Sequence, residues 1–469
     1  VRPGEIAAMR ADHRAAVLGE LDAAAALIDD PKLPSTSKAF RIAWEHSDEI
    51  VRLREEYTQQ LKFAASHLSA PPGLAMGDAA IDAKISAAVV LSPPTLRLPQ
   101  GPVPGVWRDE LLARLDKQVT TKTPFVERLV NFWSNHFCIA RQKSPLVNIA
   151  AGAYEREVIR PNVFGRFHDM LLASARHPAM LIYLDNYLSI GPTSAVGLRA
   201  KRGVNENLGR EIMELHTLGV DGGYTQADVT AFATALTGWS FAEPRSKDAE
   251  PGTFFFSVNR HSPGPVTILG KDYPQPGVEQ AEAALVDFAR HPATARHIAR
   301  KLVRHFVGDD AAPSLVDRLA AVFRETDGDL RAVVIALIEA DEAWSAPPVK
   351  VLSPWDLLVA AGRMLDIDWS FNEASRMLDL FGQPLWTVPF PSGWPDDDYA
   401  WAAPTSLLEL LSAVSALSRR NAGDRNILRL ADDTLGPFLG EQTRRTVERA
   451  ETRDVALALL LMSPEFLKR

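Results

Sequence analysis

The segment 205–219 concentrates side chains that can do acid–base or metal chemistry. At the roughly 100° spacing of an α-helix, Asn207, Arg210, Glu211 and Glu214 fall on one face, opposite a stripe of leucine and isoleucine. Paired carboxylates can bind a divalent metal ion, or hold different pKa values and act as acid and base. We therefore predict Glu211 and Glu214 as catalytic residues or metal ligands, with Arg210 fixing an anionic group and Asn207 binding substrate.

An ordinary solvated helix face is the alternative interpretation of these residues. Charged side chains are usually exposed, and an Arg210–Glu214 pair on an exposed helix contributes only about 0.3–0.5 kcal/mol. The residues that follow favour a constrained site, because Gly219, Gly222 and Gly223 precede an alanine-rich helix that permits close approach of neighbouring backbone. We therefore expect the polar face to be buried.

His136 continues an apolar helical series upstream of this segment. Phe125, Leu129, Phe132 and His136 occupy positions i, i+4, i+7 and i+11 of a predicted helix. A buried histidine must be hydrogen-bonded or liganded, because an unsatisfied polar group costs about 1–3 kcal/mol. We predict His136 as a catalytic residue that assists the carboxylate pair, with a satisfied core histidine as the alternative.

Four more residues complete the predicted site. Asp185, at the end of an apolar run, is either a third metal ligand or an ordinary helix-end residue. Arg166 is a second cation that could bind substrate or neutralise the carboxylates. Trp239 and Trp394 are assigned to substrate binding. Trp394 lies in the proline- and tryptophan-rich segment 382–404, which predicts either a stacking platform or an ordered cover over a helical core.

The composition limits the classes of function. The chain has 469 residues, of which 46% are apolar and 23% charged, as in folded globular proteins. A net charge of −8 disfavours a nucleic-acid partner. The only cysteine, Cys138, excludes an intrachain disulfide and a cysteine-based zinc site, and we expect it to be inert. The sequence motifs of zinc proteases, serine hydrolases, nucleotide-binding loops and calcium loops are missing, as are apolar runs of membrane-spanning length.

The elements that must position these residues are predicted to be helical. Apolar spacing of three and four dominates, which predicts a mainly α fold: a large multi-helical body with a small β-hairpin insertion whose arms are 253–257 and 266–269. Proline-rich breaks suggest an N-terminal helical region, 1–105, and a central region, 106–275, with the site and the hairpin. The C-terminal region, 276–469, carries the proline- and tryptophan-rich cover.

Several motifs are similar to those of one bacterial family, the domain-of-unknown-function 1800 family. They are Phe132-Trp-Ser-Asn-His-Phe137, the segment 205–219, Asp221-Gly-Gly-Tyr-Thr225, Ala235-Leu-Thr-Gly-Trp239, Pro391-Ser-Gly-Trp-Pro395 and the ending 463–469. The resemblance covers nearly the whole chain. It implies an exported protein that acts beside an alkaline-phosphatase-like exported partner, and it assigns no catalytic residues.

The residues and the resemblance together favour an extracytoplasmic hydrolase. Carboxylates, or one divalent metal ion held by them, would assist the reaction. The alternative is a noncatalytic binding or assembly protein that acts with the exported partner. The chain begins at Val1 with neither an initiator methionine nor an apolar signal region, so we expect that an export signal was removed or never existed. The resemblance to an exported family implies a periplasmic or extracellular location, with a cytoplasmic one as the alternative.

Overall fold

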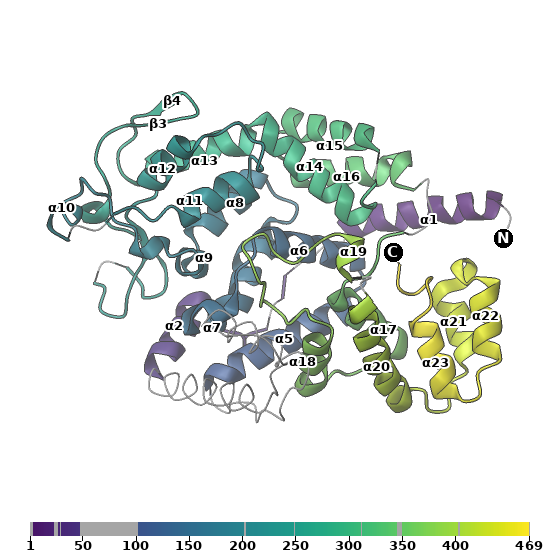
Figure 1. The fold of residues 1–469 in the computed structure, drawn as a ribbon. Coiled ribbons are helices and arrows are strands. Elements are labelled where there is room, and N and C mark those ends of the chain that lie inside the picture. The colour runs from purple at the N-terminus through teal and green to yellow at the C-terminus, as the bar shows by residue number, and fades with distance from the viewer. Residues whose placement is uncertain are drawn as a thin grey trace, which may run out of the picture.

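The computed structural model consists mainly of helices, which confirms the predicted fold class (Figure 1). It describes residues 3–22, 27–28, 30–46, 102–200, 203–247, 249–310, 312–344, 349–401 and 404–468. The predicted N-terminal region beyond residue 46 therefore lies largely outside the described residues. No helix within the described ranges is long and apolar enough to cross a membrane.

The strands form two separate sheets instead of the single predicted hairpin. β1 (Trp239–Phe241) pairs antiparallel with β2 (Phe254–Phe256), and β3 (Val266–Ile268) pairs antiparallel with β4 (Lys271–Tyr273). The two predicted arms thus belong to different sheets. The reason is local, because Leu269 and Gly270 both have positive φ, 51° and 73°, and this tight turn returns the chain directly onto β3.

The first half of the chain builds the helices around the predicted site. Its α-helices are α1 (Pro3–Asp22), α2 (Thr36–Glu45), α5 (Pro102–Thr120), α6 (Pro124–His136), α7 (Pro145–Tyr154), α8 (Phe167–Arg176), α9 (Pro178–Tyr183), α10 (Gly197–Ala200), α11 (Asn207–Glu211) and α12 (Gln226–Ala235). Two π-helical segments extend α7 and α11, namely η2 (Glu155–Ile159) and η5 (Ile212–His216). The short 3₁₀ turns are η1 (Arg141–Lys143), η3 (Arg160–Asn162), η4 (Asn186–Leu188) and η6 (Val258–Arg260).

The second half of the chain is helical apart from its connecting loops. Its α-helices are α13 (Val278–Arg290), α14 (Pro292–Phe306), α15 (Pro313–Glu325), α16 (Leu330–Glu339), α17 (Pro354–Leu365), α18 (Phe371–Leu380), α19 (Asp398–Trp401), α20 (Pro404–Asn421), α21 (Ile427–Leu435), α22 (Glu441–Glu448) and α23 (Arg453–Leu461), with 3₁₀ turns η7 (Asp341–Ala343) and η8 (Gly436–Phe438). Many of these helices start with proline in the first turn, where its missing N–H costs no hydrogen bond.

The buried apolar residues form two cores. The larger core takes in α1, α2, α6 to α9 and α11 to α16, and the smaller one joins α17, α18 and α20 to α23 with Leu111 and Leu115 of α5. Figure 1 shows α21 to α23 gathered at one side of the molecule, far from α10 and the β3–β4 sheet. Along the chain, the larger core extends to Ala340 and includes Val388, whereas the smaller core contains Leu111, Leu115 and residues from Trp355 onward.

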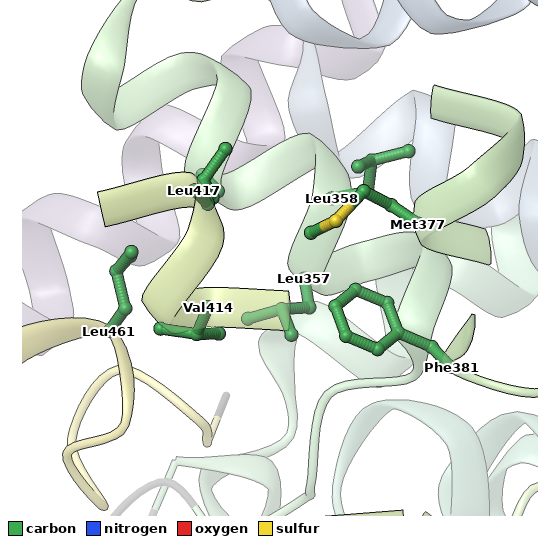
Figure 2. Close-up of a pocket in the computed structure, with 8 residues that line it drawn as sticks. Leu357, Leu358, Met377, Phe381, Val414, Leu417 and Leu461 are labelled. Atoms are coloured by element: carbon green, nitrogen blue, oxygen red, sulfur yellow. The ribbon is translucent and has the colours of Figure 1, made fainter. Parts of the chain in front are cut away.

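The interior of the smaller core is mainly apolar. Figure 2 shows a small space within it, lined by Leu357, Leu358, Ala361, Met377, Phe381, Val414, Leu417 and Leu461. The side chains that line this space are all apolar.

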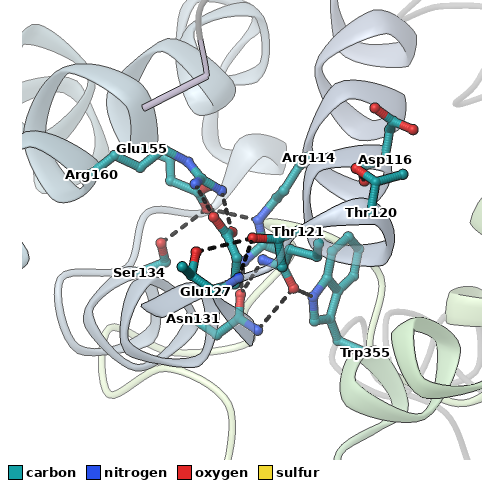
Figure 3. Close-up of polar contacts among 12 residues, drawn as sticks. Arg114, Asp116, Thr120, Thr121, Glu127, Asn131, Ser134, Glu155, Arg160 and Trp355 are labelled. Atoms are coloured by element: carbon teal, nitrogen blue, oxygen red, sulfur yellow. Dashed lines mark hydrogen bonds and ion pairs between the residues drawn. The ribbon is translucent and has the colours of Figure 1, made fainter. Parts of the chain in front are cut away.

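A buried ionic cluster connects α5, α6 and η2 (Figure 3). The guanidinium of Arg160, with no exposed side-chain area, makes two hydrogen bonds to Glu127, at 2.9 and 3.0 Å, and two to Glu155, at 2.9 and 3.1 Å. Arg114 donates to Glu155 at 2.7 Å, and Ser134 donates to it at 3.0 Å. Two arginines and two glutamates balance in charge, which a buried cluster requires.

The same cluster reaches the smaller core through an amide. Gln118 of α5 exchanges hydrogen bonds with Asn131 of α6, and its carbonyl oxygen accepts from the indole N–H of Trp355 in α17 at 2.8 Å. Arg114 also stacks over the Trp355 ring, 4.2 Å from its centroid. The helix α5 therefore links both cores through polar as well as apolar contacts.

Candidate functional site

The predicted carboxylate pair lies where α11 becomes the π-helix η5. Glu211 is the last residue of α11 and Glu214 lies within η5. The neighbouring helix α12 starts with the expected capping box, in which Thr225 and Asp228 bond reciprocally, and α11 approaches α12 closely at Gly209, where a Cβ atom would lie 3.2 Å from the Cα of Ala233. Single π-helical turns inside α-helices occur often at functional sites.

The polar face is less buried than predicted. Asn207 is exposed, while Arg210, Glu211 and Glu214 are each partly exposed. The reason is the direction of the close approach, because Gly209 is about 200° around the helix from Glu211. The narrow contact therefore buries the opposite side of α11 and leaves the polar face at the edge of the core.

Arg210 is engaged away from the two predicted catalytic carboxylates. Its guanidinium donates to Glu206 at 2.9 Å and to Gln226 at 3.0 Å. Glu206 also accepts from Thr230 of α12 at 2.6 Å. The Arg210–Glu214 pair weighed in the sequence analysis does not occur. Arg210 instead binds Glu206, which lies one helical turn toward the N-terminus and whose carboxylate is already hydrogen-bonded to residues of α12.

Glu211 and Glu214 have no recorded hydrogen bond or ion pair with any described residue. Burial raises the pKa of Glu211, and the neighbouring charge of Glu214 raises it further, while Arg210 opposes both effects. The predicted repulsion between the two carboxylates is therefore present. A half-buried carboxyl without a partner and with a raised pKa is a candidate for proton transfer.

Cys138 and Tyr183 are buried residues that interact electrostatically with Glu211. Burial raises the pKa of the Cys138 thiol to about 12, and the thiol donates to the carbonyl oxygen of Pro391 at 3.2 Å. Burial also raises the pKa of Tyr183, with smaller contributions from Cys138 and Glu211. The thiol is therefore neutral and unreactive near pH 7, in line with expectation.

His136 is hydrogen-bonded at both ring nitrogens. Its Nε2 lies 3.1 Å from the carbonyl oxygen of His216, and its Nδ1 lies 2.9 Å from Nζ of Lys301. A carbonyl only accepts, so Nε2 carries the proton and Nδ1 accepts from lysine. Burial, followed by the charge of Lys301, lowers the pKa of His136 well below its usual value. No recorded hydrogen bond joins His136 to the carboxylate pair, so its expected role as their assistant is not supported by a contact.

The π-helix explains why histidines gather at this point. The last carbonyls of a helix have no donor within it. Nε2 of His136 donates to the carbonyl of His216, and Nε2 of His297 donates to the carbonyl of Leu215 at 3.1 Å. Side chains from α6 and α14 thus satisfy the end of η5.

Asp185 and Arg166 are not brought to the carboxylate pair. Asp185 adopts the left-handed conformation after α9, with φ of 59°, and its carboxylate binds Lys143 at 2.6 Å. Arg166 precedes α8 and donates to the carbonyl oxygens of Thr326 and Asp327 at 3.2 and 3.1 Å. The described residues contain no group of three or more side chains placed to share a metal ion, so the predicted three-carboxylate ligand set is not assembled.

The two tryptophans differ in their access to a ligand. Trp239 is fully buried in β1 and packs against Phe254 with ring centroids 5.3 Å apart, so it presents no surface for its predicted substrate contact in this structure. Its apolar ring is simply part of the larger core. Trp394 is partly buried, and its backbone exchanges hydrogen bonds with the side chain of Asn135 at 2.7 and 2.9 Å. Segment 386–401 therefore lies on the end of α6, as expected of a cover.

Two residues of this region were missed in the sequence. His297 and Lys301 lie on α14 at i and i+4, and His305 follows at i+8, which places all three on one helix face. That spacing is visible in the sequence. The contact with His136, however, joins positions 165 residues apart and could not be read from it.

The comparison with protein families gives one match. A family model described as "Protein of unknown function (DUF1800)" matches residues 1–468. The chain belongs to the DUF1800 family. Searches of curated proteins and of solved structures found no match for this DUF1800 chain.

Proposed function

We propose that this DUF1800 protein is a hydrolase in which Glu211 and Glu214 act as the acid–base pair. The observation that carries the proposal is the state of Glu211: a partly buried carboxyl without a recorded hydrogen bond or ion pair, beside a second carboxylate. Its raised pKa favours the protonated form needed by a general acid, and Glu214 would then activate water.

A divalent metal ion bound by the same two carboxylates is the second form of this proposal. The ion would neutralise their repulsion and lower the pKa of a bound water molecule. Asp185 belongs to neither form, because Lys143 holds its carboxylate.

We also propose a periplasmic or extracellular location and an alkaline-phosphatase-like exported partner. The support for both is the family resemblance. A noncatalytic binding or assembly role is the competing function, and it is favoured by the exposed Asn207 and by the Arg210–Glu206 network on the same surface.

The test compares Glu211→Gln and Glu214→Gln with Glu441→Gln. Glu441 is an exposed control, paired with Arg445 on α22, far along the chain from the site. Wild type and variants are assayed with ester, peptide, glycoside and phosphoester substrates, and their metal content and melting temperature are measured. We expect the two site variants to lose about 100-fold or more in rate, and the control to match wild type.

The same experiment can overturn the proposal. If both site variants keep wild-type activity and metal content and change only the melting temperature, the carboxylates are structural. If the wild type hydrolyses none of the four substrate classes and contains no metal, a binding or assembly role replaces the hydrolase.

A further inference from the structure

α14 presents three basic side chains in a row to its neighbours. His297 donates to the carbonyl of Leu215 at 3.1 Å, and His305 bonds the carboxylate of Asp396 at 2.9 Å. Lys301, between them, donates to Nδ1 of His136 at 2.9 Å, and this is its one recorded hydrogen bond within the described part of the chain. The lysine thus faces an imidazole where a carboxylate would be usual.

The imidazole of His136 is held in one tautomer. Nε2 donates to the carbonyl of His216 at 3.1 Å, which leaves the lone pair of Nδ1 directed at Lys301. A nucleophile, a base within hydrogen-bond reach, and a third group that orients the base form the general arrangement of covalent catalysis. Lys301, His136 and the His216 carbonyl meet this description.

The surroundings of Lys301 contain no direct counter-ion. No carboxylate of a described residue lies within ion-pair distance of it. The titratable or charged groups around it are His136 of α6, Cys138 two residues after α6, His216 of η5, His297 and Arg300 of α14, and Asp396 of the cover. Burial lowers the pKa of Lys301 to about 8, while Cys138 and Asp396 oppose the effect.

Lys350 is the internal contrast. Lys350 is a buried lysine, and its Nζ lies 3.0 Å from Asp309, 3.5 Å from Asp398 and 3.9 Å from Asp396. These carboxylates compensate its charge and occupy its donors. The contrast shows that Lys301 is not simply a second structural lysine of the same kind.

We propose that Lys301 is a nucleophilic amine that forms a Schiff base with an aldehyde or ketone, and that the acceptor Nδ1 of His136 is a positioning group that orients the amine. This activity is separate from the proposed hydrolase and does not depend on Glu211 or Glu214. Lys301 is partly exposed.

The reaction balances without a further reagent. The ammonium of Lys301 releases a proton to water, and the amine lone pair attacks the carbonyl carbon while the C=O electron pair moves to oxygen. A proton passes from nitrogen to that oxygen, giving a carbinolamine. The hydroxyl takes a proton back from water and leaves as water when the C=N bond forms. One ammonium and one carbonyl compound thus give one protonated imine and one water.

The test is reductive trapping on the whole protein. Propanal and cyanoborohydride are added at pH 7, and each lysine is quantified by peptide mass spectrometry. We expect Lys301 to be alkylated at least tenfold faster than the exposed Lys271 and than the carboxylate-bound Lys350. An alkylation rate at Lys301 equal to or below that of Lys271 would overturn the proposal.

Variants test the orienting role of His136. His136→Leu removes the hydrogen-bond acceptor and should slow alkylation of Lys301 several-fold, whereas His136→Gln keeps an acceptor and should restore most of the rate; Lys271 stays unchanged in both. Equal rates at Lys301 in wild type and His136→Leu would contradict the role of His136. If these variants do not fold, the wild-type pH profile replaces them: half-maximal reactivity near pH 8 at Lys301 supports the proposal, whereas a rise that continues to about pH 10, as for an ordinary amine, contradicts it.

Discussion

The two π-helical segments, η2 and η5, carry the same residue type in opposite electrostatic states. In η2, Glu155 accepts hydrogen bonds from Arg114, Arg160 and Ser134. Burial raises the pKa of Glu155, but the two arginines outweigh it and hold the pKa below its usual value. Glu211, the last residue of α11 before η5 begins, has no such partners among the described residues, and its pKa is raised.

This difference separates a structural carboxylate from a candidate functional one. Both glutamates occur where an α-helix widens into a π-helix, so backbone geometry does not distinguish them. The neighbours do: α5 and η3 direct arginines at Glu155, whereas Arg210 beside Glu211 is drawn to Glu206. A buried carboxylate with arginine partners is compensated in the folded state. A partly buried carboxylate without such partners lowers the free energy of unfolding.

The largest expected effect is the removal of a cation from the η2 cluster. Arg160→Met leaves Glu127 and Glu155 buried with one cation fewer, and we expect the free energy of unfolding to fall by about 3–5 kcal/mol. Urea denaturation measures it. The control, Arg420→Met, breaks the exposed pair with Glu373 and should cost less than about 1 kcal/mol. Equal stability of the two variants would refute the assigned importance of the cluster.

The same neutral substitution in both π-helical regions sharpens the comparison. Glu155→Gln removes the charge that two arginines bind, and we expect a loss of about 2–3 kcal/mol. Glu211→Gln removes a charge without a partner and ends its repulsion with Glu214, so stability should stay within about 0.5 kcal/mol of wild type or increase. Thermal and urea unfolding compare them. A larger loss for Glu211→Gln than for Glu155→Gln would reverse our interpretation.

The smallest effect is a difference in pH dependence. The folded-state pKa of Glu155 is lowered, so its contribution is present above the ordinary glutamate pKa of about 4.3 and is lost as pH falls through the folded value. The folded-state pKa of Glu211 is raised, so its contribution is full below about pH 4.3 and is lost as pH rises through the folded value. Unfolding of wild type and each glutamine variant across this range should give slopes of opposite sign.

Several features of this protein followed from the sequence alone. The mainly α class, the clustering of Asn207, Arg210, Glu211 and Glu214 on one helix face and the Thr225–Asp228 capping box all depend on neighbours within about four residues. Periodicity and capping report these local relations directly. The strand signals were also real, but the turn at Leu269 and Gly270, which assigns each strand its partner, was missed.

Tertiary structure decided which of these side chains are compensated. Arg160 and Arg114 bind Glu155 from other elements. Lys301 binds His136, which lies 165 residues earlier in the sequence, and Lys143 forms an ion pair with Asp185. A spacing pattern places a charge on a face, but its partner comes from a helix distant in sequence. Desolvation and ion pairing depend on what surrounds the charge in space, so pKa values and the division into structural and reactive groups arise only when the helices pack.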